Sequence, residues 1–444
     1  MNNVETYQEA LGRYAARAMK APAGEPAWLA DSRRKAVARF LETGFPTERE
    51  ESWRYSDLTP LLAVPFQSSK GAEQRVVDSL RSEVLAVPDA RRLVFVDGRY
   101  DARLSTIGEP IPGLKWGSFA EAIRSGFEAP QEAWNQAPIS TPFFDLNTAL
   151  FEDGALVVVD KGAEVTPTLH LVFITTYAGV PSESHLRNLI LLGENARVTV
   201  VESHLGGPGL HFSNSHTQVS LSAGSALNYA RLQEESLFTG YSIGTLTARL
   251  ASDSKLNSSL ASLGGHRVRH ESVVRFQGPG AECNLDGVCL SRCQQHVDCR
   301  TFVDHAVPGC TSRQMYKGVL DGRSTLVFDG RVLVRENAQK TDAQQNNKNL
   351  LMSPDAMAYS KPQLEIYAND VKCSHGSATG PVDSDVLFYL RSRGIPLADA
   401  KRILVRAFVG ELLERFKPEA WVEPLKLRVR DWLVRPEDEN LKES

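Results

Sequence analysis

The sequence predicts a mainly β fold: a right-handed parallel β-helix core (a β-solenoid) flanked by N-terminal and C-terminal helical regions. Two observations support this prediction. Between about residues 151 and 380, helical periodicity gives way to short alternating runs such as GALVVVDKG and ARVTVVESHLG, separated by Gly, Ser, Asn and Asp. In the same region a tetrad of one turn residue, two small or polar residues and one apolar residue recurs at near-constant spacing.

The five tetrads are GAEV, NARV, GSAL, DSKL and GAEC, which end at Val165, Val198, Leu227, Leu256 and Cys283. Successive end residues are 33, 29, 29 and 27 positions apart. One coil of a solenoid cannot bury its own apolar face, so successive coils stack and share a core. A β-sandwich is the competing all-β prediction, but its strands usually recur every roughly 8–12 residues without a regular longer period. The solenoid is therefore preferred.

The changes between helical and strand-like sequence patterns predict three domains. These are a mainly helical N-terminal domain (1–150), the solenoid core (151–380) and a helical C-terminal domain (381–444). In the first, PAWLADSRRKAVARFLETGFP has apolar residues at helical spacing. RRLVFVDGRY predicts a short strand with a turn at Asp97–Gly98.

The C-terminal domain is predicted to contain two helices. Asp383 is a suitable N-cap for the first, Gly394 suits the position after its end, and Pro396 opens the second. The expected apolar stripe of the second helix consists of Ile403, Leu404, Ala407, Phe408, Leu412 and Phe416. Such an appendage could lie on the solenoid and still expose Tyr389, Arg391 and Arg393.

Composition excludes several functional classes. The chain has 444 residues, 42% of them hydrophobic and 23% charged, and 50 basic against 54 acidic residues give a net charge of −4. No global positive field would attract nucleic acid or anionic membranes. No apolar run is long enough for a membrane span, and the first twenty residues contain no secretory apolar segment. With six cysteines in no paired framework, we expect a cytoplasmic protein.

Cys283, Cys289, Cys293 and Cys299 cluster in the sequence with gaps of six, four and six residues. These gaps match no common zinc or iron–sulfur spacing, so core packing is preferred to metal binding. We therefore expect Ser or Ala variants of these cysteines to retain function. His204, His211 and His216 are expected to be surface groups on strands. No P-loop, dinucleotide fingerprint or Ser–His–Asp order is present.

The stretch VKCSHGSATG, residues 371–380, is a different case. Alternation along a strand places Cys373 and His375 on one face, so a thiol and an imidazole could converge at the end of the last β segment. Three alternatives follow from the residues: half of a metal site, a Cys–His nucleophile pair, or two residues that end a strand. The last is slightly preferred on chemistry alone.

Two long motifs resemble the SufB/SufD family of iron–sulfur cluster assembly proteins. One is QKTDAQQNNKNLLMSPDAMAYSKPQLEIYANDVKCSHGSATGPVDSDVLFYLRSRGI, residues 339–395, and the other is GFPTEREESWRYSDL, residues 44–58. SufB-type chains carry a cysteine in the segment matching QQNNKNLLMS, which this sequence lacks. The resemblance is therefore to the SufD branch, and it covers essentially the whole chain.

The resemblance implies a non-enzymatic scaffold subunit of a SufB–SufC–SufD complex. It implies pairing with SufB through the solenoid edge, docking of the SufC ATPase on residues 383–416, and His375 as a ligand at the SufB interface. Cys373 is a weaker ligand candidate. The cargo would be a transient iron–sulfur cluster shared with SufB, and reduced flavin (FADH2) is associated with the complex without assigned residues. The alternatives are a β-solenoid polysaccharide lyase or hydrolase and a stand-alone metal-binding homodimer.

Overall fold

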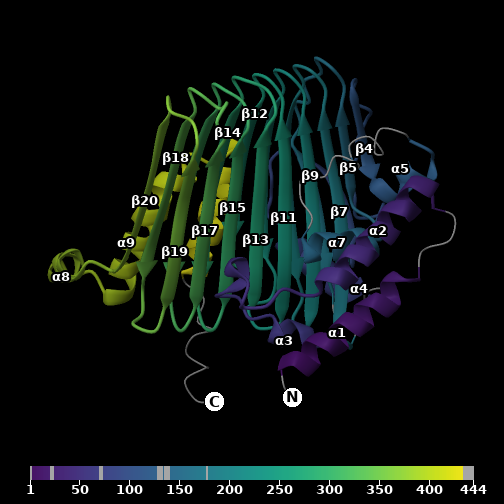
Figure 1. The fold of residues 1–444 in the computed structure, drawn as a ribbon. Coiled ribbons are helices and arrows are strands. Elements are labelled where there is room, and N and C mark those ends of the chain that lie inside the picture. Colours follow the sequence, from purple (N-terminus) through teal and green to yellow (C-terminus); the bar gives the residue numbers. More distant parts are fainter. Residues whose placement is uncertain are drawn as a thin grey trace.

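The computed structural model describes residues 3–20, 25–69, 74–127, 134, 141–176 and 179–433. Its core is a β-solenoid of about 8 turns, and its walls are two ten-stranded sheets between which the chain alternates (Figure 1). Sheet A consists of β1 (Gln67–Ser68), β4 (Leu114–Ser118), β5 (Ala155–Val159), β7 (Ser182–Leu192), β9 (His211–Leu221), β11 (Gly240–Leu250), β13 (Arg267–Phe276), β15 (His296–His305), β17 (Thr325–Val334) and β19 (Met357–Ile366). Sheet B consists of β2 (Arg91–Val96), β3 (Arg99–Tyr100), β6 (Leu169–Thr175), β8 (Arg197–Gly206), β10 (Ala226–Glu234), β12 (Lys255–Ser262), β14 (Glu282–Ser291), β16 (Thr311–Leu320), β18 (Asp342–Leu351) and β20 (Lys372–Pro381).

The register of sheet B confirms the predicted repeat. Val198, Leu227, Leu256 and Cys283 are direct partners in four successive parallel strands. All four are buried, as is Val165 one coil earlier. The apolar residue of each tetrad thus forms an interior column, and each coil covers the apolar face of the one before it.

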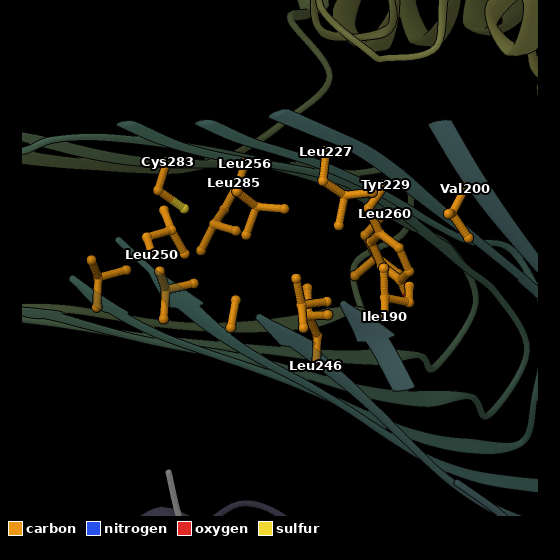
Figure 2. Close-up of a cluster of buried hydrophobic side chains, with 14 of the residues drawn as sticks. Ile190, Val200, Leu227, Tyr229, Leu246, Leu250, Leu256, Leu260, Cys283 and Leu285 are labelled. Carbon is orange, nitrogen blue, oxygen red and sulfur yellow. The ribbon is translucent and has the colours of Figure 1, made fainter. Parts of the chain in front are cut away.

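The interior of the solenoid is a continuous apolar core between the sheets. Figure 2 shows Leu227, Leu256 and Cys283 of sheet B facing Leu246 and Leu250 of sheet A. Because side chains alternate along a strand, the residues between these inward positions, such as Ala261 of β12 and Val288 of β14, project to the outer face of sheet B. Truncating a fully buried leucine of this core, such as Leu256, should cost about 2–5 kcal/mol of stability.

Of the N-terminal helices, α4 packs on β6 of sheet B, whereas α1, α2 and α7 lie over sheet A on one face of the solenoid (Figure 1). Asn147 of α7 fixes them there by donating to the backbone carbonyls of Leu186 and Asn214, at 2.9 Å each. The predicted helix and the predicted turn at Asp97–Gly98 are both present, and the turn joins the antiparallel pair β2 and β3. The helical segments of this region are α1 (Asn3–Ala18), α2 (Ala27–Thr43), the 3-10 turn η1 (Glu51–Trp53), α3 (Thr59–Leu62), α4 (Gln74–Glu83), α5 (Phe119–Arg124) and α7 (Pro142–Leu150).

Three C-terminal helices follow the solenoid: α8 (Ser384–Ser392), α9 (Leu397–Leu413) and α10 (Glu419–Trp432). The predicted caps of α8 are confirmed, since Asp383 accepts hydrogen bonds from the backbone amides of Asp385 and Val386, and Gly394 has a φ of +85°. Helices α9 and α10 pack on the outer face of sheet B through an apolar cluster that includes Val288 and Val319 of the strands.

The predicted apolar stripe of α9 was partly wrong. Ile403 is 44% exposed, whereas Val405 and Val409 are buried against sheet B. The helix is apolar around more than half of its circumference, so apolar spacing alone does not define which side faces sheet B. Contacts with residues elsewhere in the chain set the rotation of the helix about its own axis. The Lys317 ammonium of β16, for example, donates to the carbonyl of Phe408 at 2.8 Å and pairs with Glu411. Among the described residues, no helix is long and apolar enough to cross a membrane.

Candidate functional site at the open end of the solenoid

The two ends of the solenoid differ. At the N-terminal end the sheets finish in short antiparallel strands, β4 with five residues and β3 with two. At the other end they finish in β19 and β20, with ten residues each. Within the described residues, the outer edges of β19 and β20 have no partner strand. A long edge with unpaired N–H and C=O groups is a template for another strand, so this open end is the part of the fold best suited to pairing.

Cys373 lies on the interior column that the tetrads define. The column continues from Cys283 through Ser312 and Ala343 to Cys373 in β20. The Cys373 side chain therefore faces the interior, where it packs against the end of the apolar core and is half-buried. Burial raises the pKa of its thiol, and the nearby carboxylate of Asp342 raises it further. The thiol must therefore lose a tightly held proton before it can bind a metal.

His375 lies two residues further along β20, on the same face as Cys373, as alternation predicted. It pairs in register with Gln345 of β18, which pairs with Gln314 of β16. Both glutamines are buried, but His375 is exposed because no further coil covers it. The imidazole is thus an interior group left open to solvent by the end of the solenoid.

A column of buried amides leads up to His375. Thr301 donates to Oε1 of Gln314 at 2.6 Å, and Nε2 of Gln345 lies 3.4 Å from the same oxygen. Oε1 of Gln345 accepts no hydrogen bond from the described residues. Sequence reasoning missed these amides, although extending the repeat beyond the last tetrad by one coil would have located Gln314 and by two coils Gln345. The polar column ends at the exposed imidazole of His375.

Small polar groups connect the strands of the end coil. Ser377 of β20 donates to Oγ of Ser360 in β19 at 2.8 Å across the lumen, and within sheet B Nδ2 of Asn349 donates to Oγ1 of Thr379 at 3.1 Å. The first bond holds the two edge strands together at the level of His375. The edges of β19 and β20 therefore form one surface with Cys373 and His375 between them.

The N-terminal motif GFPTEREESWRYSDL is attached to this same end. The ring of Tyr55 stacks on Tyr359 of β19, and Lys361 of β19 pairs with Glu51. The Arg269 guanidinium lies 3.7 Å from the centroid of the Trp53 ring. We call the segment from Glu51 to Ser56 the N-terminal brace.

A second connection runs from the brace across the outer face of sheet A. Ser56 donates to Asp298 at 2.6 Å, and Arg300 joins Asp298 to Asp329 at 3.2 and 2.6 Å. Asp329 then accepts from Gln363 of β19 at 3.0 Å. The brace thus reaches the last strand of sheet A, β19, both directly and through the two strands before it, β15 and β17. Its sequence gave no sign of this role.

Helix α8 projects from the solenoid beside the open end (Figure 1). None of its residues is buried, and Phe388 is 75% exposed. Tyr389, Arg391 and Arg393 are exposed as expected, and the Arg393 guanidinium lies 5.2 Å from the centroid of the Tyr389 ring. The helix therefore presents aromatic and basic groups that the chain itself does not cover.

Three of the four clustered cysteines are core residues as predicted: Cys283, Cys289 and Cys299 are each at most 2% exposed. Cys293 is an exception, since it lies in the turn after β14 with a φ of +57° and is half-buried. Among the described residues, no group of three or more His, Cys, Asp and Glu side chains could hold a metal ion.

The expectation for the scattered histidines was wrong. His204, His211 and His216 are all at most 2% exposed. His204 faces the lumen 3.2 Å from Glu202, His211 faces it 2.9 Å from the carbonyl of Gly209, and His216 lies under α7 against the ring of Phe144. Strand propensity does not show whether a strand is covered on one face or on both. These histidines are buried because their strands face the lumen on one side and are covered by helices or loops on the other.

The fold and its open end define a β-solenoid protein that presents a thiol and an imidazole between two unpaired strand edges. Comparison with known families agrees with this description. Residues 173–408 match the family described as SUF system FeS cluster assembly, SufBD core domain, and residues 4–171 match the SufBD protein N-terminal region. The chain belongs to the SufB/SufD family of iron–sulfur cluster assembly proteins and is a SufD homologue.

Individual relatives support the assignment. The chain is 31% identical to the iron–sulfur cluster assembly protein SufD of Escherichia coli over 398 residues, 88% of this chain and 90% of the relative. It is 29% identical to an iron–sulfur cluster assembly SufBD family protein of Synechocystis over 88% of both chains. Identity to SufD of Bacillus subtilis is 24% over 276 residues, 62% of this chain and 63% of the relative.

Proposed function

We propose that this chain is a non-catalytic scaffold subunit that pairs with SufB and places His375 as a ligand to the nascent iron–sulfur cluster. The observation that carries the proposal is the position of His375: an interior group, exposed only because the solenoid ends there, between two unpaired ten-residue edges. A partner edge that extends either sheet would cover His375 and convert an open imidazole into an enclosed one.

A shared site explains why one chain carries so few ligands. A single imidazole binds iron weakly, and a thiolate supplied by the partner would complete the coordination shell only in the assembled complex. A site divided between two subunits also suits cargo transfer, because a small movement of one subunit would open the shell. The cluster is therefore treated as cargo that both subunits hold for a short time.

Cys373 is the second ligand in the proposal. Its Sγ lies on the same face of β20 as His375, but packing against the core and a raised pKa both favour the neutral thiol. Metal binding would have to displace that proton. We therefore assign His375 the larger effect and test Cys373 separately.

We further propose that the SufC ATPase docks on α8 and the start of α9, within residues 383–416. The exposed residues Tyr389 and Arg391 of α8, and Arg393 directly after it, support this. Aromatic and arginine side chains are the residue types that most often dominate binding energy at interfaces. Helix α8 projects beyond β20, away from the strands, where the chain itself leaves it uncovered (Figure 1).

Reduced flavin is not assigned to residues of this chain. The end coil offers serine, threonine, cysteine and histidine side chains around His375, with no aromatic ring on β20 to stack on an isoalloxazine. These groups do not fit a flavin, so no step of the proposal uses one.

The test uses the complex reconstituted with its SufB and SufC partners. Iron content and visible absorption are measured after cluster assembly with wild type, His375→Ala and Cys373→Ala. We expect His375→Ala to lose most of the cluster absorption while the complex elutes at the same size. Ser374→Ala is the matched control, because Ser374 lies between the two on β20 and projects outward. Wild-type loading by His375→Ala would contradict the ligand role.

A further inference from the structure

A pair of thiols meets inside the solenoid, away from the open end. Sγ of Cys289 in β14 lies 3.3 Å from Sγ of Cys299 in β15, and both residues are buried. The two strands belong to opposite sheets, so the thiols face each other across the lumen. A short turn joins the strands, and the two cysteines are ten residues apart in the chain.

The small neighbours of Cys289 leave its sulfur room to move toward Cys299, which lies between His270 and Phe328 on sheet A. A disulfide has a sulfur–sulfur distance of about 2.05 Å, so the thiols would need to approach by about 1.3 Å. The register neighbours of Cys289 are Ser262 and Gly318, both small. Sγ of Cys289 can therefore rotate toward Cys299 without meeting a large side chain on its own sheet.

We propose that Cys289 and Cys299 are an oxidation site that forms an intramolecular disulfide across the lumen with a small organic disulfide as oxidant. The thiolate of one cysteine attacks the small disulfide, which gives a mixed disulfide and releases one small thiol. The second cysteine then attacks the cysteine sulfur of the mixed disulfide and releases the other small thiol. One sulfur–sulfur bond breaks for the one that forms, the two cysteine protons end on the released thiols, and the protein gives up two electrons.

The reaction requires the coil to open. The hydrogen bond with Cys289 and burial raise the pKa of the Cys299 thiol well above its ordinary value. Exchange needs a thiolate, so the closed protein should react slowly. Urea below the unfolding midpoint, which increases local opening, should accelerate the reaction.

The experiment treats the full chain with 2-hydroxyethyl disulfide in native buffer and in urea below the midpoint. After an acid quench, remaining thiols are alkylated with iodoacetamide in denaturant. Trypsin then cleaves after Arg275, Arg292 and Arg300, which places Cys289 in peptide 276–292 and Cys299 in peptide 293–300. We expect the two peptides to appear joined, with a mass lower by two hydrogens than their sum, and reduction to separate them.

Variants test whether the other two cysteines of these peptides form the link instead. Cys283 and Cys293 lie in the same two peptides, so the Cys283→Ser/Cys293→Ser variant should still give the joined species. Adding Cys299→Ser should abolish it. Oxidised wild type should also show a higher urea midpoint that dithiothreitol returns to the starting value. The proposal is overturned if both cysteines are recovered alkylated under the urea condition, or if the link runs through Cys283 or Cys293.

Discussion

The ring of Tyr55 stacks on the ring of Tyr359, with centroids 4.3 Å apart and planes inclined by 14°. This contact joins a segment that precedes the whole solenoid to the strand that ends sheet A. Together with the ion pair between Glu51 and Lys361, it fixes β19 from its outer face. The partner edge in the proposed complex would meet a strand that the N-terminal brace holds in place.

Removing the brace contact should loosen β19. An aromatic pair contributes about 1 kcal/mol, so Tyr55→Ala should speed amide hydrogen exchange in β19 by about 5-fold. The measurement is hydrogen exchange of residues 357–366 in the isolated chain, which needs no partner. Phe238→Ala is the matched control, because Phe238 is also an exposed aromatic residue and lies in the turn after β10. Unchanged exchange in Tyr55→Ala would show that the stack does not brace the strand.

Helix α8 provides a second prediction. Phe388→Ala should weaken binding of the ATPase by about 30-fold, as expected when an exposed aromatic side chain becomes the centre of an interface. Its melting temperature should not change, because no residue of α8 is buried. Leu427→Ala on α10, where Leu427 is 52% exposed, is the control for loss of an exposed apolar side chain. Calorimetric titration that gives equal affinities for wild type and Phe388→Ala would exclude α8 from the interface.

Asp286 gives a pH-dependent prediction. It lies under α9, where burial raises its pKa to about 6 despite the Arg415 guanidinium, whose Nη2 is 3.1 Å from Oδ1. The folded state therefore holds this proton more tightly than the unfolded state. The stabilisation is complete below the unfolded pKa near 4 and is lost as pH rises through about 6. Compared with Asp286→Asn, wild type should gain about 1.4 kcal/mol of unfolding free energy between pH 7 and pH 5.

Urea titrations at several pH values measure this difference. The comparison with Asp286→Asn is needed because buried histidines act in the opposite direction: burial lowers the pKa of His305 to about 4, so its protonation destabilises the fold below pH 6.5. Arg415→Leu removes the cation that opposes the shift, and the loss of stability should then occur at higher pH. Parallel pH curves for wild type and Asp286→Asn would contradict the prediction.

Much of the solenoid could be predicted because its repeat is local. A turn residue followed by an inward apolar residue is visible in one dimension, and the four intervals between tetrads correspond to single coils of sheet B. The caps at Asp383 and Gly394 are local for the same reason. Alternation also placed Cys373 and His375 on one face correctly, since it depends only on strand geometry.

The features that sequence reasoning missed depend on which distant elements cover a strand. His216 was expected at the surface, but α7 buries it, and the rotation of α9 depends on Lys317 more than ninety residues earlier. The brace depends on a contact between residues 304 positions apart, Tyr55 and Tyr359. No local pattern encodes these pairings, so only the assembled fold shows that the N-terminal motif belongs to the open end.

The last prediction concerns Gln345, which pairs with His375 in register and projects into the same lumen. Its Oε1 is buried and accepts no hydrogen bond from the described residues, so it is placed to accept one from the imidazole and orient it. Gln345→Leu should leave the stability of the isolated chain unchanged or slightly raised, because an unsatisfied buried acceptor is removed. Iron loading of the reconstituted complex should nevertheless fall by about 10-fold, the usual cost of losing a group that orients a metal ligand. Gln344→Leu makes the same change on the outward face of β18 and should load normally. Normal loading by a stable Gln345→Leu complex would show that His375 needs no support from the column beneath it.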